Sequence, residues 1–164
     1  LPDFSSEERT FQLITQVIGR AKRGHQNSNI FIQSFQPDHP IISLASQSDY
    51  ASFYNYLVQK RQQSKLPPYS FLLKLSVTYK TETATVKNIR TLYKKVIQTA
   101  KQLQIPENRI VVSPPMPAFH ERTSTGYTWQ LVIKAKSRQN LLDIFDHLPK
   151  NNYLHYDFDP ISLL

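Results

Sequence analysis

Residues 127–136 read YTWQLVIKAK and have the alternating pattern of a β-strand. Successive side chains of a strand point to opposite faces, so this stretch separates into two sets. The mostly apolar set is Tyr127, Trp129, Leu131, Ile133 and Ala135, and the mostly polar set is Thr128, Gln130, Val132, Lys134 and Lys136. Such a strand belongs to a sheet that is covered on one side only. We therefore expect Trp129 in the core rather than as a platform for stacked bases.

The segments around this strand predict the rest of an α+β fold. Residues 69–79, 109–113 and 153–159 have the composition of strands, whereas 83–103 and 137–148 have helical periodicity. Residues 114–122, PPMPAFHER, form a proline-rich connection. The predicted order is β-α-β-β-α-β, the split βαβ arrangement, in which two helices cover one face of a four-stranded antiparallel sheet. The other face is expected to be open for binding.

The sequence pattern of the first 66 residues predicts a mainly helical segment with one strand. A helix begins in residues 3–21, where Ser5 and Glu8 form a capping box. The apolar residues expected on its broad inner face are Phe11, Leu13, Ile14, Val17 and Ile18. Residues 30–35, IFIQSF, predict a short strand, and 40–65 predict two helices, the second capped by Asp49. Pro67 and Pro68 mark the boundary with the C-terminal part, so the predicted pieces are 1–37, 38–66 and 67–164.

Charge is the most informative feature of the composition. The 164 residues carry a net charge of +8 and contain no cysteine. The excess of Lys and Arg over Asp and Glu is +2 in residues 1–65 and +6 in residues 66–164. Basic residues together with many aromatic ones are typical of a nucleic-acid surface, although a basic domain with an aromatic core has the same composition. The candidate DNA contacts are Arg122, Tyr127, Lys134 and Lys136.

The sequence gives little support for a membrane protein, a metalloprotein or a secreted protein. The longest apolar runs are too short to cross a membrane, so no membrane partner is expected. The five histidines lack the spacing of metal ligands, and Asp157 and Asp159 are interpreted as pairing groups, so no metal site is predicted. The start is acidic and polar, unlike a secretory signal. Because it also lacks Met, we expect a fragment of a longer chain.

One motif has the character of a catalytic site. Gln16, Gly19, Arg20 and Arg23 are spaced at i, i+3, i+4 and i+7, which places them on one face of a helix. An amide and two guanidinium groups can there converge on a polyanion. Gly19 costs about 1 kcal/mol relative to alanine inside a helix, so a packing or functional reason is expected for it. Glycines occur only at positions 19, 24 and 126, which excludes a phosphate-binding loop in this chain.

This motif resembles the last conserved motif of superfamily 2 helicases. The longer stretches 3–24, 30–42, 49–71, 111–138 and 157–160 are similar to the primosomal protein N′ (PriA) family of bacterial replication-restart helicases. The resemblance implies that 1–37 is the tail of the second helicase lobe, 38–66 a helical linker and 67–164 a ribosomal-S10-like domain. It also implies a parent that is an ATP-dependent 3′–5′ DNA helicase, which recognises stalled or repaired forks and assembles the primosome.

The family resemblance assigns roles to individual residues. Arg20 and Arg23 match the arginines that reach the ATP γ-phosphate, Gln16 would orient that site, and Gly19 would allow close approach. ATP with Mg is the implied cofactor of the parent, and its zinc ligands would precede Leu1. The fragment alone is expected to be inactive. Arg138 matches an arginine that binds the acidic tail of single-stranded DNA-binding protein.

The implied partners are single-stranded and branched DNA, that tail and other primosome proteins, and we expect a cytoplasmic, nucleoid-associated monomer. Three positions depart from the family pattern: Lys22, Leu57 and Thr128. Two alternatives remain. One is a stand-alone RNA- or ribosome-binding split βαβ module, and the other is a protein-interaction domain that binds no nucleic acid. The motif with Gln16, Arg20 and Arg23 favours the helicase interpretation, because an RNA-binding module has no use for γ-phosphate arginines.

Overall fold

A computed structural model describes residues 3–21 and 29–163 and confirms the predicted α+β class. The chain divides into two compact units, one over residues 3–64 and the other over residues 65–163. The division of the first unit into a lobe tail and a linker stays a prediction. Each unit has its own hydrophobic core, and they are described separately.

The first unit consists of the helices α1 (Ser6–Ala21), α2 (Pro40–Ser46) and α3 (Tyr50–Gln63). Its core centres on Phe11 of α1 and Phe53 of α3, whose rings stack with centroids 3.9 Å apart. The ion pairs Glu7–Lys60 and Glu8–Arg61 join the same two helices. Stacked rings flanked by two ion pairs fix how α1 and α3 pack together.

Asp49 caps α3, as predicted: its carboxylate accepts a hydrogen bond from the Ser52 amide at 3.0 Å. The hydrogen bonds from Ser52 lower the pKa of Asp49 below its ordinary value. This carboxylate therefore stays charged, and it keeps its capping role, in moderately acidic solution.

Two predictions for the first unit are wrong. Phe11 and Ile18 are buried on α1, but Leu13 and Val17 are 62% and 46% exposed, so the buried face is narrower than expected. Residues 30–35, predicted as a strand, form none, and Phe31 is 91% exposed. A strand needs a neighbour for its backbone hydrogen bonds, and no other described segment pairs with this one.

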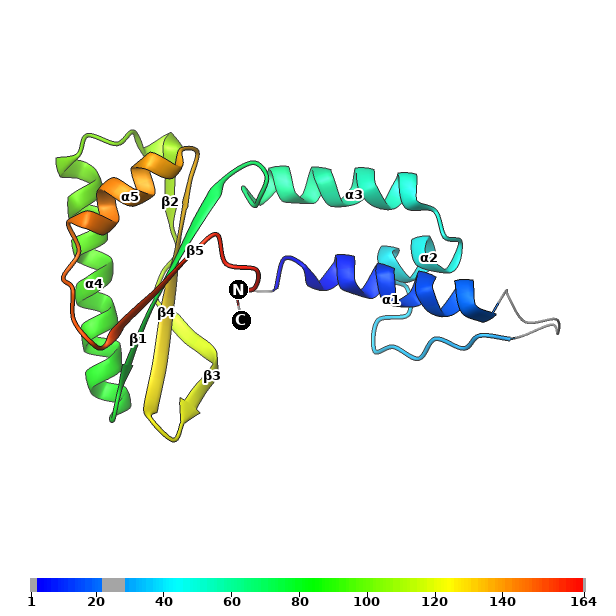
Figure 1. Ribbon diagram of the computed structural model, residues 1–164, viewed down its shortest axis with the longest axis horizontal. Helices are drawn as coiled ribbons and strands as arrows, with labels where there is room; N and C mark the ends of the chain where they lie inside the picture. The colour runs from blue at the N-terminus through cyan, green and yellow to red at the C-terminus, as the bar shows by residue number, and fades with distance from the viewer. Residues whose placement is uncertain (1–2, 22–28, 164) are drawn as a thin grey trace. The chain divides into compact units, whose positions relative to one another are not determined.

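The second unit is built on a five-stranded antiparallel sheet (Figure 1). The strands are β1 (Phe71–Tyr79), β2 (Ile110–Val112), β3 (Met116–Thr123), β4 (Gly126–Ala135) and β5 (Leu154–Phe158). The main order is β2-β4-β1-β5, and β3 also pairs with β4. The helices α4 (Glu82–Gln102) and α5 (Arg138–Asp146) lie on the same side of this sheet, and a short 3-10 helix, η1 (Glu107–Arg109), precedes β2.

The alternation of residues 127–136 holds in the structure. The core between sheet and helices contains Leu131, Ile133 and Ala135 of β4 together with side chains of β1, α4 and α5. Trp129 packs against this core, as expected, and its indole N–H donates to Glu121 at 3.0 Å. Gly126 has φ +138°, and a Cβ there would lie 2.2 Å from the Tyr79 carbonyl oxygen, so this turn requires glycine.

Strand β3 contradicts the prediction of a connection over residues 114–122. The strand pairs with β4 through Met116 and Pro117 at one end and Arg122 and Thr123 at the other, with an irregular register between them. Proline lacks the N–H that a central strand needs, but an edge strand or an irregular register tolerates it. The prolines therefore indicated an edge position rather than the absence of a strand.

The expectation of a fully open second face is also wrong. Gln130 on that face is 2% exposed, and its side-chain amide donates to the Leu163 carbonyl at 2.9 Å. The segment after β5 therefore lies against this face. Asp159 begins the segment with φ +49°; its amide donates to the Leu72 carbonyl, and its carboxylate accepts from the Leu72 amide. This carboxylate has the pairing role that the sequence predicted for it.

Candidate nucleic-acid and partner interface

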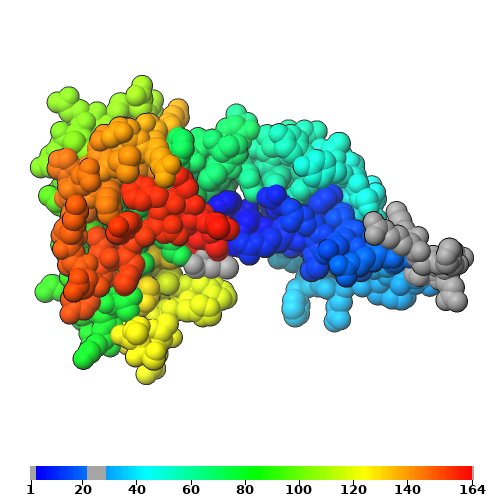
Figure 2. Space-filling view, viewed as in Figure 1, coloured from blue at the N-terminus to red at the C-terminus, as the bar shows by residue number. Residues whose placement is uncertain are grey.

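The structure brings two of the four predicted DNA contacts together. Arg122 of β3 and Tyr127 of β4 are direct partners in the strand register. The Arg122 guanidinium lies 5.6 Å from the centroid of the Tyr127 ring, within the range of a cation–π contact. The hairpin that carries them projects from the second unit (yellow in Figure 2). The guanidinium therefore lies over the ring, and the hairpin presents a cation and an aromatic group at one point, a combination typical of single-strand-binding surfaces.

The other two predicted contacts lie at the far end of β4. Tyr127 and Lys134 are seven residues apart on one strand, which corresponds to about 23 Å. Lys136 is exposed, but Lys134 is half-buried. Burial lowers the pKa of the Lys134 ammonium, and the neighbouring charge of Lys65 lowers it further. Lys134 is thus less available to a phosphate than its place in the sequence suggested.

Arg109 is a cation that sequence reasoning missed beside Lys136. The Lys136 amide donates to the Arg109 carbonyl at 3.0 Å, so the two exposed residues are neighbours across the sheet edge. Arg109 and Lys136 are far apart in the sequence, so no local sequence pattern indicates that they are neighbours.

Arg138 is the first residue of α5, at the helix start where it was expected. Its Nε atom lies 3.8 Å from Asp159 Oδ2, and the two side chains are 58% and 36% exposed. Ser137 precedes the helix but makes no side-chain capping bond. The guanidinium and the helix N-terminus can therefore both attract a carboxylate, in competition with Asp159.

The helicase-like motif is only partly described. Gln16 and Arg20 are exposed on α1 one turn apart, and Arg23 lies outside the described residues. A Cβ added at Gly19 would meet no atom of the described residues within 4 Å, so no packing contact in this part of the chain explains the glycine. The exposed Leu13 and Val17 lie on the same helix. No group of three or more His, Asp or Glu side chains among the described residues could hold a metal ion.

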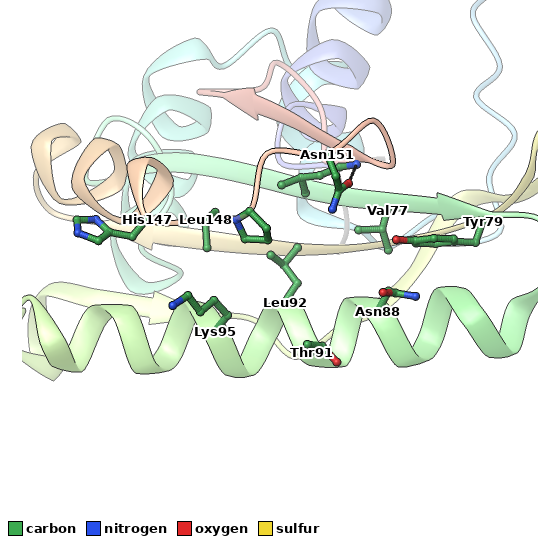
Figure 3. Close-up of a pocket in the computed structure, with 11 residues that line it drawn as sticks. Val77, Tyr79, Asn88, Thr91, Leu92, Lys95, His147, Leu148 and Asn151 are labelled. Atoms are coloured by element: carbon green, nitrogen blue, oxygen red, sulfur yellow. Dashed lines mark hydrogen bonds between the residues drawn. The ribbon is translucent and has the colours of Figure 1, made fainter.

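An apolar pocket of about 420 Å³ lies between α4 and the connection from α5 to β5 (Figure 3). Val77, Leu92 and Leu148 form part of its apolar lining. Asn88 and Lys95 of α4 and Asn151 of the connection contribute polar groups from opposite sides. Nothing in the sequence indicated this pocket, because its walls come from separate segments.

Comparison with known proteins identifies the family. The family described as "Primosomal protein N C-terminal domain" matches residues 62–161. The chain belongs to the PriA family. It is 31% identical to the "Replication restart protein PriA" of Synechocystis sp. over 98% of the chain and 19% of that protein. The protein of the same name from Chlamydia pneumoniae is 30% identical over 99% of the chain and 22% of that protein.

A third relative, from Bacillus subtilis, is 32% identical over 86% of the chain and 17% of that protein. The chain thus spans about a fifth of the length of these PriA relatives. The match to the family's C-terminal domain confirms the resemblance that the sequence motifs indicated. Among the described residues, no helix is long and apolar enough to cross a membrane.

Proposed function

We propose that this PriA-family chain is the C-terminal part of a bacterial ATP-dependent 3′–5′ DNA helicase that restarts replication at stalled or repaired forks. The observation that carries the proposal is the match of the family's C-terminal domain to residues 62–161. The parent would act in the cytoplasm, at the nucleoid, and would assemble other primosome proteins. The second unit would be a split βαβ domain of the ribosomal-S10-like kind; the strand order and the position of both helices on one face support this.

The helicase-like motif would supply half of an ATP site. Gln16 and Arg20 are exposed on one face of α1 and free to meet a phosphate held elsewhere in the parent. Arg20 and Arg23 would stabilise charge that develops on the γ-phosphate, where bound Mg and ATP supply the phosphoryl chemistry. The exposed Leu13 and Val17 support packing against another part of the parent. The chain alone would not hydrolyse ATP, and the zinc of the parent would be bound by residues outside it.

The test of this half-site uses the full-length parent. We expect Arg20→Ala to lower ATP hydrolysis at least tenfold while DNA binding stays within twofold, because the arginine acts on the transition state. Gln12→Ala, on the same helix, is the control. Unchanged turnover in Arg20→Ala would contradict the proposal.

Gly19→Ala provides a stability measurement on the same motif. In the 164-residue chain it should raise the free energy of unfolding of the first unit by about 0.5–1 kcal/mol, since the added Cβ meets no atom. In the parent it should lower turnover if another part approaches this face closely. Equal turnover of Gly19→Ala and wild type would show that no other part of the parent needs a glycine here in order to pack closely against α1.

The second unit would bind single-stranded and branched DNA. Arg122 and Tyr127 on the hairpin, with Lys136 at the other end of β4, are the contacts carried forward from the sequence. Lys134 would contribute least, because this residue is half-buried. The net charge of +8 supports association with a polyanion.

A salt titration tests DNA binding by the chain. We expect weak binding of a labelled single-stranded or forked oligonucleotide at low salt, with affinity falling steeply as salt rises, because cations released from phosphates drive the association. Arg122→Gln should weaken binding more than Lys134→Gln does. No detectable binding at low salt would overturn the proposal of a DNA-binding unit.

Arg138 would bind the acidic tail of single-stranded DNA-binding protein. Its half-exposed guanidinium, the uncapped start of α5 and the long 3.8 Å contact with Asp159 support this role. The terminal carboxylate of the tail would replace Asp159 as its partner.

Calorimetric titration of the tail peptide tests this contact. Arg138→Ala should weaken binding about tenfold or more, because a charge-assisted hydrogen bond is lost. Asp159→Asn should strengthen binding, since it removes the competing charge and keeps a side chain that tolerates positive φ. Equal affinities of Arg138→Ala and wild type would exclude this arginine from the site.

A further inference from the structure

Helix α4 carries a line of cations on the side that does not pack on the sheet. Lys87, Arg90, Lys94 and Lys101 are all exposed, and at 3.6 residues per turn they fall within about 60° of one another. The line is about 21 Å long at 1.5 Å per residue. The only acidic residue of α4, Glu82, lies outside this sector.

Within the part of the chain that the structure describes, no acidic side chain forms an ion pair with these cations. Arg90 and Lys94 are like charges four residues apart, a spacing that destabilises a helix by about 0.2–0.5 kcal/mol. The cations are therefore exposed to a polyanion in solution, and their mutual repulsion would decrease when one binds.

The apolar pocket adjoins this line. A shallow hollow lined by Lys87, Arg90 and Lys94, and also by Glu82, shares Thr91 with the pocket that Lys95 borders. Tyr79 forms one wall of the pocket, and its ring stacks on Tyr153 with centroids 4.6 Å apart, so at most one ring face is left on which a base can stack.

Two amides add polar groups at the pocket, and their own hydrogen bonds orient them. The Asn88 side-chain N–H donates to the Ala84 carbonyl, which leaves its oxygen as an acceptor. The Asn151 side-chain oxygen accepts from the Tyr153 and Leu154 amides, which leaves its NH₂ group as a donor. Figure 3 shows both amides among the residues that line the pocket, Asn88 on α4 and Asn151 on the connection to β5. They can pair with the edge of a nucleobase.

We propose that the outer face of α4 and this pocket form a binding site for single-stranded nucleic acid. Lys87, Arg90 and Lys94 contact phosphates along the strand, and one unstacked base enters the pocket between Asn88 and Asn151. The site lies on the helical side of the sheet, apart from the β3–β4 hairpin. This inference rests on the proposed function, because it requires that the second unit binds nucleic acid. It adds the surface of the unit on which the nucleic acid binds.

The geometry favours a nucleic acid over an acidic peptide. The 21 Å line matches about six nucleotides of a stacked strand at 3.4 Å each. An acidic peptide has backbone amides that can pair with the two side-chain amides of the pocket, so the spacing of the cations and the aromatic wall at Tyr79 are what favour a nucleic acid. A duplex keeps its bases stacked, so it can use the phosphate contacts and not the pocket.

The charge contribution is tested with the full chain and a fluorescein-labelled 12-nucleotide oligothymidylate by fluorescence anisotropy. We expect Arg90→Gln/Lys94→Gln to weaken binding about tenfold at low salt and to reduce the slope of log K against log salt by about 1.4, the value for two phosphate contacts of a single strand. The control Lys65→Gln/Lys80→Gln removes the same charge from exposed positions off α4 and should change affinity less than twofold. If the wild-type chain binds and the Arg90→Gln/Lys94→Gln variant binds equally well, this site is overturned and the proposed function stands. If the wild-type chain does not bind at all, both are overturned.

The pocket is tested by a substitution that changes no charge. Thr91→Trp should block the junction of hollow and pocket and weaken binding of the single strand about tenfold, while binding of a 12-base-pair duplex stays within twofold. Gln102→Trp, exposed near the end of α4, is the control and should leave both unchanged. An equal loss for single strand and duplex would overturn the base-binding role. A glutamate decamer is also tested as a competitor. If it displaces the labelled oligonucleotide as effectively as unlabelled oligonucleotide does, the surface is assigned to acidic peptides instead.

Discussion

The pairing of β4 with β1 is the constraint on which the second unit depends. Their register runs without interruption from Phe71 opposite Ala135 to Tyr79 opposite Tyr127. It places the apolar alternate residues of both strands on one face, where α4 and α5 cover them. Burial of the inner side of α4 then leaves its basic residues on the outside. The same register sets where the β3–β4 hairpin projects and where α5 begins, so each candidate contact follows from one pair of strands.

Much of this fold could be predicted from the sequence, because its main elements have strong periodicity. The alternation in residues 127–136 predicted β4 and its inner face, and the helical pattern after Thr81 predicted α4. Edge strand β3 was missed because its prolines read as a connection. Residues 30–35 have strand composition, but composition cannot supply a neighbouring strand. The burial of Gln130 depends on the chain end returning to the sheet, a long-range contact without a local signal.

The candidate site was predictable where it is local in sequence. Arg138 lies at a helix start, and Gln16 and Arg20 share a helical face, because both features follow from helical spacing alone. The contact of Arg122 with Tyr127 depends on the missed strand. Lys134 was expected on an open face, but its surroundings bury part of the side chain. The cations of α4 are evident in the sequence, but their spacing alone does not distinguish a binding surface from a solvated helix face. The pocket beside them is formed by three separate segments, so it has no local signal.

A nucleic-acid surface on α4, separate from the sheet and its hairpin, is the central claim. Its most direct measurement is a nuclear magnetic resonance titration of the ¹⁵N-labelled chain with unlabelled oligothymidylate. The largest shift changes are expected at the backbone amides from Lys87 to Lys95 and at the side-chain NH₂ group of Asn151, a donor that is available to a base. Changes confined to the β3–β4 hairpin and Lys136, with α4 and Asn151 unaffected, would contradict the claim.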